Sequence, residues 1–254
     1  MKITFLGTGT SQGIPIIGSD HPVCLSDDSR DKRLRTSALI RWDDFAIVID
    51  CGPDFRQQML RENVKKLDAI LFTHEHADHT AGLDEIRPYN YRQGAMPFYA
   101  HERVFISLKE RFDYIFTTKN RYPGAPSVEE KLINKDNPFY LGGKKIIPIE
   151  AMHDKLPVLG FRIDDFTYLT DIKTISKEEL KKIYGTKVLV LNALRKEAHY
   201  SHLTLNEAIE LAQHINPKKT YFTHISHHLG FHAEVENELP PNIHLAYDTL
   251  TITI

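Results

Sequence analysis

The sequence has few cysteines and no long apolar run, and both shortages narrow the class of protein. Two cysteines, Cys24 and Cys51, cannot form the disulfide framework of a small secreted domain. No stretch of about 18 apolar residues occurs, and the opening Met-Lys-Ile-Thr-Phe-Leu-Gly is typical of a strand and not of a signal peptide. We therefore expect a cytoplasmic protein without a membrane segment.

A strong excess of charge of either sign is also missing. The formal net charge is −2 at pH 7, whereas a nucleic-acid enzyme usually carries a basic patch. A small anionic substrate requires no such surface. The charge balance therefore favours a small substrate over nucleic acid.

The order of apolar runs predicts an α/β fold. With 254 residues, 41% of them apolar, the chain can bury a large core, and we expect one domain over residues 1–254. Ser176 with Glu179, and Thr204 with Glu207, match capping boxes of helices that end near Tyr184 and Ile215. Interleaved strands and helices indicate two sheets between layers of helices. The strands are expected at 3–6, 45–49, 69–72, 145–149, 159–163, 167–169, 188–191, 220–222 and 249–254.

One segment, residues 111–140, does not fit this alternation. It contains several aromatic and basic residues and a Tyr-Pro-Gly-Ala-Pro break. A surface excursion that packs its own aromatics and a lid or homodimer arm are both compatible with this composition.

Histidine is the residue type that stands out in the composition. The chain has 14, clustered at 74–79, 199–202 and 224–232. In the loop after the apolar run 69–72, alternation directs His74 and His76 toward one ion, while Asp78 and His79, past a bend, address a second. Imidazole and carboxylate ligands suit zinc, manganese or iron(II).

Three further polar residues end apolar strands in the same way: His153, Asp171 and His224. With them the sequence resembles the metallo-β-lactamase fold hydrolases over essentially its whole length. The matching signature is Asp50 in Ile-Asp-Cys-Gly, then His-x-His-x-Asp-His at 74–79, then those three residues.

The resemblance implies an αββα sandwich with two divalent ions, zinc or manganese. It assigns His74, His76 and His153 to one ion, Asp78, His79 and His224 to the other, and Asp171 to a bridge between them. Asp50 would support the ligands from outside. Together the ions would activate a bridging hydroxide for hydrolysis.

Smaller motifs indicate the branch. The run Phe5 to Pro15 is similar to the start of the phosphodiesterase branch. The closer likeness is to the phosphoribosyl cyclic phosphate phosphodiesterases, in which a catalytic histidine matches His202. This implies hydrolysis of a small cyclic phosphate or nucleotide-like phosphodiester, with His202 as general acid and Asp78 and Asp50 in the catalytic centre. The glycines of the opening run either form a tight turn or bring backbone N–H groups near the site.

The same likeness predicts a third, structural zinc. His21, Cys24 and His227 match three of its ligands, but Ser19 and His21 stand where the family has cysteines. Only three ligands are evident, whereas structural zinc sites normally have four.

Other functions share the metal loop. A tRNA 3′-end-processing endonuclease has the same opening run and ligands, but we find no basic, glycine- and proline-rich arm. A glyoxalase-type thioesterase usually ends in helices, whereas residues 250–254 read as a strand. A metal-binding domain without turnover would not need the complete ligand set together with His202.

Overall fold

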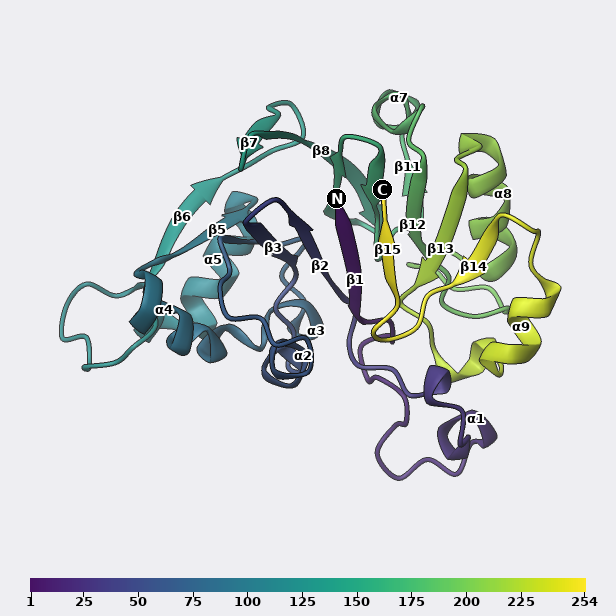
Figure 1. The fold of residues 1–254 in the computed structure, drawn as a ribbon, viewed down its shortest axis with the longest axis horizontal. Coiled ribbons are helices and arrows are strands. Elements are labelled where there is room, and N and C mark those ends of the chain that lie inside the picture. Colours follow the sequence, from purple (N-terminus) through teal and green to yellow (C-terminus); the bar gives the residue numbers. More distant parts are fainter.

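The computed structural model describes residues 1–254 and contains two mixed β-sheets packed face to face, with helices on both outer faces (Figure 1). This confirms the predicted αββα sandwich. The termini lie side by side, and the Met1 ammonium donates a hydrogen bond to the Ile254 carbonyl at 2.7 Å.

The first sheet has seven strands in the order β15-β1-β2-β3-β4-β5-β6. Strands β3 to β6 run parallel, and the pairs β15–β1, β1–β2 and β2–β3 are antiparallel. The strands are β1 (Lys2–Gly7), β2 (Ser37–Trp42), β3 (Phe45–Ile49), β4 (Ala69–Leu71), β5 (Met96–Ala100), β6 (Val128–Leu132) and β15 (Thr251–Thr253).

The second sheet has eight strands in the order β11-β8-β9-β10-β12-β13-β14, with β7 paired to β8. The strands from β10 through β12 and β13 to β14 run parallel, and the others are antiparallel. They are β7 (Phe139–Leu141), β8 (Lys144–His153), β9 (Leu156–Ile163), β10 (Phe166–Tyr168), β11 (Thr174–Ile175), β12 (Val188–Asn192), β13 (Lys219–Thr223) and β14 (Ile243–Leu245).

Helices cover the outer faces (Figure 1). The longest, α8, has 11 residues, and no helix is long and apolar enough to cross a membrane. The α-helices are α1 (Pro22–Leu25), α2 (Phe55–Arg61), α3 (Ala77–Thr80), α4 (Arg87–Gln93), α5 (Glu102–Arg111), α6 (Asp113–Phe116), α7 (Lys177–Ile183), α8 (Leu205–Ile215) and α9 (His232–Glu238). Three short 3-10 helices are η1 (Ser29–Asp31), η2 (Leu83–Ile86) and η3 (His227–Leu229).

Alternation along the strands explains the layers. In β3, Ile47 and Ile49 join the apolar cluster between the two sheets, whereas Val48 joins the cluster beneath the helices of the first sheet. In β12, Val190 faces the inter-sheet cluster and Leu189 the cluster beneath the outer helices. Both strands are buried on both faces and read as continuous apolar runs, which is why they were predicted, whereas the buried strand β2 was not.

Both predicted helix starts are confirmed, with one difference. At α8, the Thr204 hydroxyl and the Glu207 carboxylate make the reciprocal capping box. At α7, Ser176 caps the helix, but the Glu179 carboxylate accepts a hydrogen bond from the backbone N–H of Glu150 at 2.8 Å. This carboxylate therefore links α7 to β8 and does not close the capping box.

The segment 111–140 is more regular than we expected. It contains α6, β6 and most of β7, and β6 extends the first sheet. Phe112, Tyr114 and Phe116 pack against the helical cluster of that sheet, and Tyr114 stacks on Tyr122 with ring centroids 5.9 Å apart. These contacts agree with a surface excursion that packs its own aromatics, while a role in a homodimer stays a prediction.

Candidate metal centre

Three candidate ligands or supports follow strand ends in a left-handed backbone conformation. Asp50 follows β3, Asp171 follows β10 after two residues, and His224 follows β13, with φ angles of 63°, 58° and 54°. This conformation costs a non-glycine residue about 1–3 kcal/mol and is concentrated at functional sites. Asp171 and His224 meet in one group of converging ligand atoms, and Asp50 contacts His79 of the same group.

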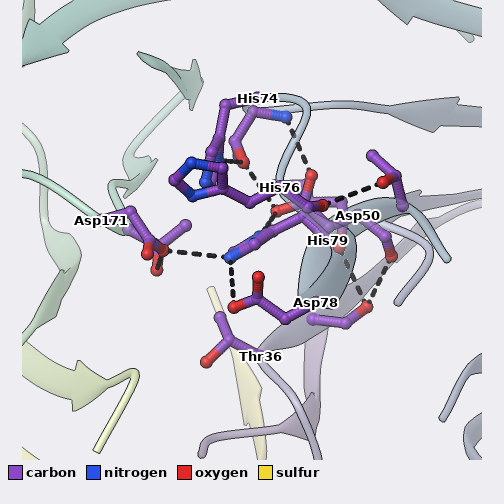
Figure 2. A network of polar contacts seen from close by, with 12 residues as sticks. Thr36, Asp50, His74, His76, Asp78, His79 and Asp171 are labelled. Carbon is purple, nitrogen blue, oxygen red and sulfur yellow. Dashed lines mark hydrogen bonds and ion pairs between the residues drawn. The ribbon is translucent and has the colours of Figure 1, made fainter. Parts of the chain in front are cut away.

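The loop after β4 supplies the next group of side chains (Figure 2). His74 and His76 precede α3, and α3 itself carries Asp78 and His79. Nδ1 of His79 lies 2.7 Å from the Asp50 carboxylate, and its Nε2 lies 3.3 Å from both Asp78 and Asp171. His79 thus points its free nitrogen at two carboxylates while Asp50 holds its other side.

Thr73 determines how His74 is oriented. Its hydroxyl donates to Asp50 at 2.8 Å, so the same oxygen accepts the Nδ1–H of His74 at 2.9 Å. The backbone N–H of Thr73 donates to the other Asp50 oxygen at 2.8 Å. This chain of bonds leaves the lone pair of His74 on Nε2.

His153 is oriented in the same way by a backbone group. Its Nδ1–H donates to the Ser201 carbonyl at 2.9 Å, which again leaves Nε2 as the lone-pair nitrogen. The Nε2 atoms of His74, His79 and His224 are buried without a hydrogen-bond partner. Buried polar atoms are rarely left unpaired. His74, His79 and His153 are held at Nδ1 and keep Nε2 for a ligand, as metal-ligating imidazoles do, whereas both ring nitrogens of His224 are unpaired. These residues therefore fit a divalent metal.

The side chains gather into two overlapping groups. The rings of His74, His76 and His153 have centroids 4.6 to 5.8 Å apart. The ligand atoms of Asp78, His79, Asp171 and His224 all lie within 4.8 Å of one another. Asp171 lies in a further group of this kind with His153 and His202. The structure therefore brings together all seven residues that the sequence assigned to metal ligation.

Charge interactions prepare the group for a cation. Burial alone raises the pKa of Asp171, but the neighbouring His224 and His79 hold that pKa well below its usual range. Burial lowers the pKa of His74 far below its usual range. For His79, burial is outweighed by Asp78, Asp171 and Asp50, which raise the pKa. The raised pKa favours a proton on His79. A metal ion would take the place of that proton, since metal binding displaces protons from ligands.

His202 lies at the wall of a cavity of about 290 Å³ next to this centre. Its Nδ1 is 3.8 Å from the Asp171 carboxylate, and its ring centroid is 4.4 Å from that of His153. Burial and the neighbouring His224 lower the pKa of His202 to about 2. The ring is therefore neutral near pH 7.

The glycine run of the N-terminus permits close packing. A Cβ on Gly7 would lie 2.0 Å from the Arg35 carbonyl oxygen, so only glycine fits there. The N–H groups of Gly9 and Thr10 donate to the carbonyls of Leu34 and Ile225. Both N–H groups are therefore paired within the protein and do not point at the site. Residues Thr10 and Ser11 nevertheless line the cavity.

The predicted third site is assembled only in part. The rings of His21 and His227 lie 4.7 Å apart, and His228 is 5.6 Å from His21. Cys24, however, is buried in a small apolar cluster with Ile14 and Val23, and no group of converging ligand atoms includes it. The third zinc stays a prediction.

Sequence reasoning missed the residues that orient the rings. No role was predicted for Thr73, and Ser201 acts through its backbone carbonyl, which no side-chain pattern reveals. A hydroxyl residue between a buried strand and a ligand histidine is a signal that could have identified Thr73.

Comparisons with known proteins agree with this geometry. Residues 46–225 match the model of the β-lactamase superfamily domain. The crystal structure of a diphosphatase from the PhnP family superposes with a TM-score of 0.93 at 40% identity, covering 100% of this chain and 97% of that one. PqqB from Methylobacterium extorquens, bound to Zn²⁺, has a TM-score of 0.81 at 18% identity and covers 100% of both chains.

Two curated relatives cover the whole of this chain. An octanoyltransferase of Porphyromonas gingivalis is 41% identical over 256 residues, but this chain spans only 52% of its length. Ribonuclease Z of Listeria monocytogenes is 26% identical over 319 residues and is matched over 99% of its length. The family model and the ligand-bearing sandwich agree, and the chain belongs to the metallo-β-lactamase fold hydrolases, near their PhnP branch.

Proposed function

We propose that this protein is a metal-dependent phosphodiesterase that hydrolyses a small cyclic phosphate or nucleotide-like phosphodiester. The observation that carries the proposal is the cavity in which His202 lies beside the oriented imidazoles and Asp171. The likeness to a PhnP-family diphosphatase, an enzyme named for phosphate chemistry, supports it.

The proposal includes two divalent ions, zinc or manganese. His74, His76 and His153 would hold one, and Asp78, His79 and His224 the other, with Asp171 shared. When bound, such ions supply electrophilic activation of water and of the phosphate. Asp50 and Thr73 hold the rings of His79 and His74 in tautomers that leave Nε2 for a metal.

His202 provides a proton for the leaving oxygen. A neutral imidazole cannot do this, and burial keeps the pKa of the free ring low. A bound phosphate brings negative charge next to the ring, which favours its protonated form. The acid role is thereby linked to the presence of an anionic substrate.

The size of the cavity favours a small substrate. A volume of about 290 Å³ accommodates a phosphate and the sugar attached to it. The likeness to ribonuclease Z gives a second candidate, cleavage of a tRNA 3′ end. We do not assign octanoyl transfer to this protein, because roughly half of the octanoyltransferase relative has no counterpart in this chain.

The test is a substrate screen with the purified protein loaded with manganese or zinc. Cyclic nucleotides and phosphodiesters should be hydrolysed, and phosphomonoesters and thioesters should not. Cleavage of a precursor tRNA without turnover of any small phosphodiester would replace the proposal by the endonuclease.

A further inference from the structure

A second cavity adjoins the metal centre. It has a volume of about 360 Å³ and shares His76, His153, Tyr200 and Ser201 with the inner cavity. Because two of these shared residues are candidate metal ligands, a substrate whose phosphate lies at the centre would extend into this outer space. The part of the substrate that the inner cavity does not hold would lie there or in solvent.

Tyr200 forms one wall of the outer cavity. Its side chain is 75% exposed, and its ring stacks on His199 with centroids 4.7 Å apart and an interplanar angle of 26°. An exposed aromatic ring beside a polar cavity is a stacking surface for a planar ring, since every nucleobase offers a π-face.

The loop that carries this stacked pair is well anchored. Leu194 donates its backbone N–H to the Leu203 carbonyl at 3.0 Å, and Leu205 donates to the Arg195 carbonyl at 2.9 Å. The Arg195 guanidinium closes the loop by donating to the Ala198 carbonyl at 2.8 Å. The backbone that carries Tyr200 is therefore held at both ends, which lowers the entropy lost when a ligand orders this loop.

Lys155 supplies the cation of the same cavity. It lies with Asp154 in the two-residue turn between the paired residues His153 and Leu156 of β8 and β9. It is exposed and lines the cavity, and its ammonium makes no ion pair or hydrogen bond with another side chain. A compact, unpaired ammonium is suited to a phosphate. The adjacent Asp154 carboxylate faces the same space and can accept hydrogen bonds from sugar hydroxyls.

We propose that this outer cavity, lined by Tyr200, Lys155 and Asp154, binds the uncleaved part of a nucleotide, with the base against Tyr200 and a second phosphate beside Lys155. The proposal rests on the proposed function for the position of the reacting phosphate. It names the substrate class as a nucleotide phosphodiester that carries a further anionic group.

The test uses binding, so that it does not depend on turnover. Dissociation constants are measured by calorimetry for the manganese-loaded protein with ribose 5-phosphate, adenosine 5′-monophosphate and adenosine 3′,5′-bisphosphate. The base should tighten binding by at least about fivefold, the lower end of what base stacking contributes. The second phosphate should tighten it by about threefold more, as expected for an exposed ion pair.

Two variants assign these gains to residues. Tyr200→Ala should remove the preference for the base and keep that for the second phosphate, and Lys155→Ala should do the reverse. Matched controls are Tyr140→Ala and Lys145→Ala, since Tyr140 is 69% exposed and both residues lie far along β7 and β8 from the cavity. Both controls should bind all three ligands as the wild type does.

The outcomes separate the two proposals. Equal dissociation constants for the three ligands in the wild type, or unchanged preferences in both variants, would overturn the outer site. If the preferences follow the variants but no phosphodiester is hydrolysed, the outer site stands and the phosphodiesterase proposal fails.

Discussion

The histidines of the metal centre and His21 of the N-terminal turn engage the same ring nitrogen, Nδ1, in opposite roles. At the centre, His153 and His79 use Nδ1 toward Ser201 and Asp50, which leaves Nε2 free. In the N-terminal turn, Nδ1 of His21 accepts the backbone N–H of Val23 at 3.3 Å and caps α1. A neutral imidazole that accepts at Nδ1 carries its proton on Nε2 and has no second lone pair for a metal.

This difference shows how metal-ligating histidines can be told from histidines that are merely clustered. The criterion is the hydrogen bond that each ring makes through Nδ1. Both regions contain clustered imidazoles, with ring centroids 4.6 Å apart for His74 and His76 and 4.7 Å apart for His21 and His227. Proximity is therefore equal in the two regions, but only at the metal centre do the partners of Nδ1 leave a lone pair on Nε2. The predictions below test this contrast, from the largest expected effect to the smallest.

Asp171→Ala should give the largest loss. Its carboxylate lies with Asp78, His79 and His224 in one group of converging ligand atoms and with His153 and His202 in another. The variant should therefore lose metal at both proposed positions and fall below detectable turnover. The loss should exceed the about 10- to 100-fold that removal of an outer partner causes. Elemental analysis and phosphodiester hydrolysis are the measurements. Unchanged metal with persisting activity would disprove a shared ligand at this position.

His202→Ala should separate catalysis from metal binding. Metal content should stay at the wild-type level, while kcat on esters with a poor leaving group should fall by about 10²- to 10⁴-fold, the usual contribution of acid catalysis. Activated nitrophenyl esters need less proton donation and should lose less. Equal losses on both types of ester would remove His202 from the acid role, and loss of metal would make it a ligand, as its place beside His153 and Asp171 permits.

Thr73→Val tests the orienting hydrogen bonds directly. The substitution keeps the shape but removes the hydroxyl that links Asp50 to His74. Metal affinity should fall by about 10- to 100-fold. Thr73→Ser restores the hydroxyl and should bind metal nearly as the wild type does. If valine and serine behave alike, the hydroxyl does not orient the ring.

Arg103→Ala tests whether the metal loop is also held from behind. Nε of Arg103 lies 2.9 Å from the Glu75 carboxylate, between two candidate ligands, and Nη2 donates to the Pro157 carbonyl of β9 at 2.5 Å. This side chain therefore connects the loop of one sheet to the hairpin that carries His153. We expect metal affinity to fall by up to about tenfold, the lower end of the range for outer partners. Arg87→Ala, which removes an exposed ion pair with Asp84, is the control and should leave the affinity unchanged.

The sequence predicted those strands and metal ligands for which an apolar run is followed closely by a histidine or an aspartate. Buried strands that end in His or Asp, such as β13 with His224, were found because both faces of the strand are apolar. Exposed strands such as β6, with Glu129 and Glu130, were missed because a charged edge strand has no apolar run. The outer cavity was missed for another reason. Lys155 and Tyr200 are far apart in sequence, and only the approach of the β8–β9 turn to the loop before α8 brings them together.

The smallest effect is expected at the N-terminal turn. His21→Ala removes the cap of α1, and loss of a cap costs about 1 kcal/mol. For a domain of this size that lowers Tm by about 2–4 °C. Because the cap needs no metal, the shift should be the same with zinc and with a chelator, and Cys24→Ala should leave the zinc content unchanged. A structural zinc held by His21, Cys24 and His227 predicts the opposite. Both variants would then lose one zinc per chain, and their lower Tm would appear only against the zinc-loaded wild type. Zinc content and Tm measured on the same samples decide whether this turn holds an ion or only a hydrogen bond.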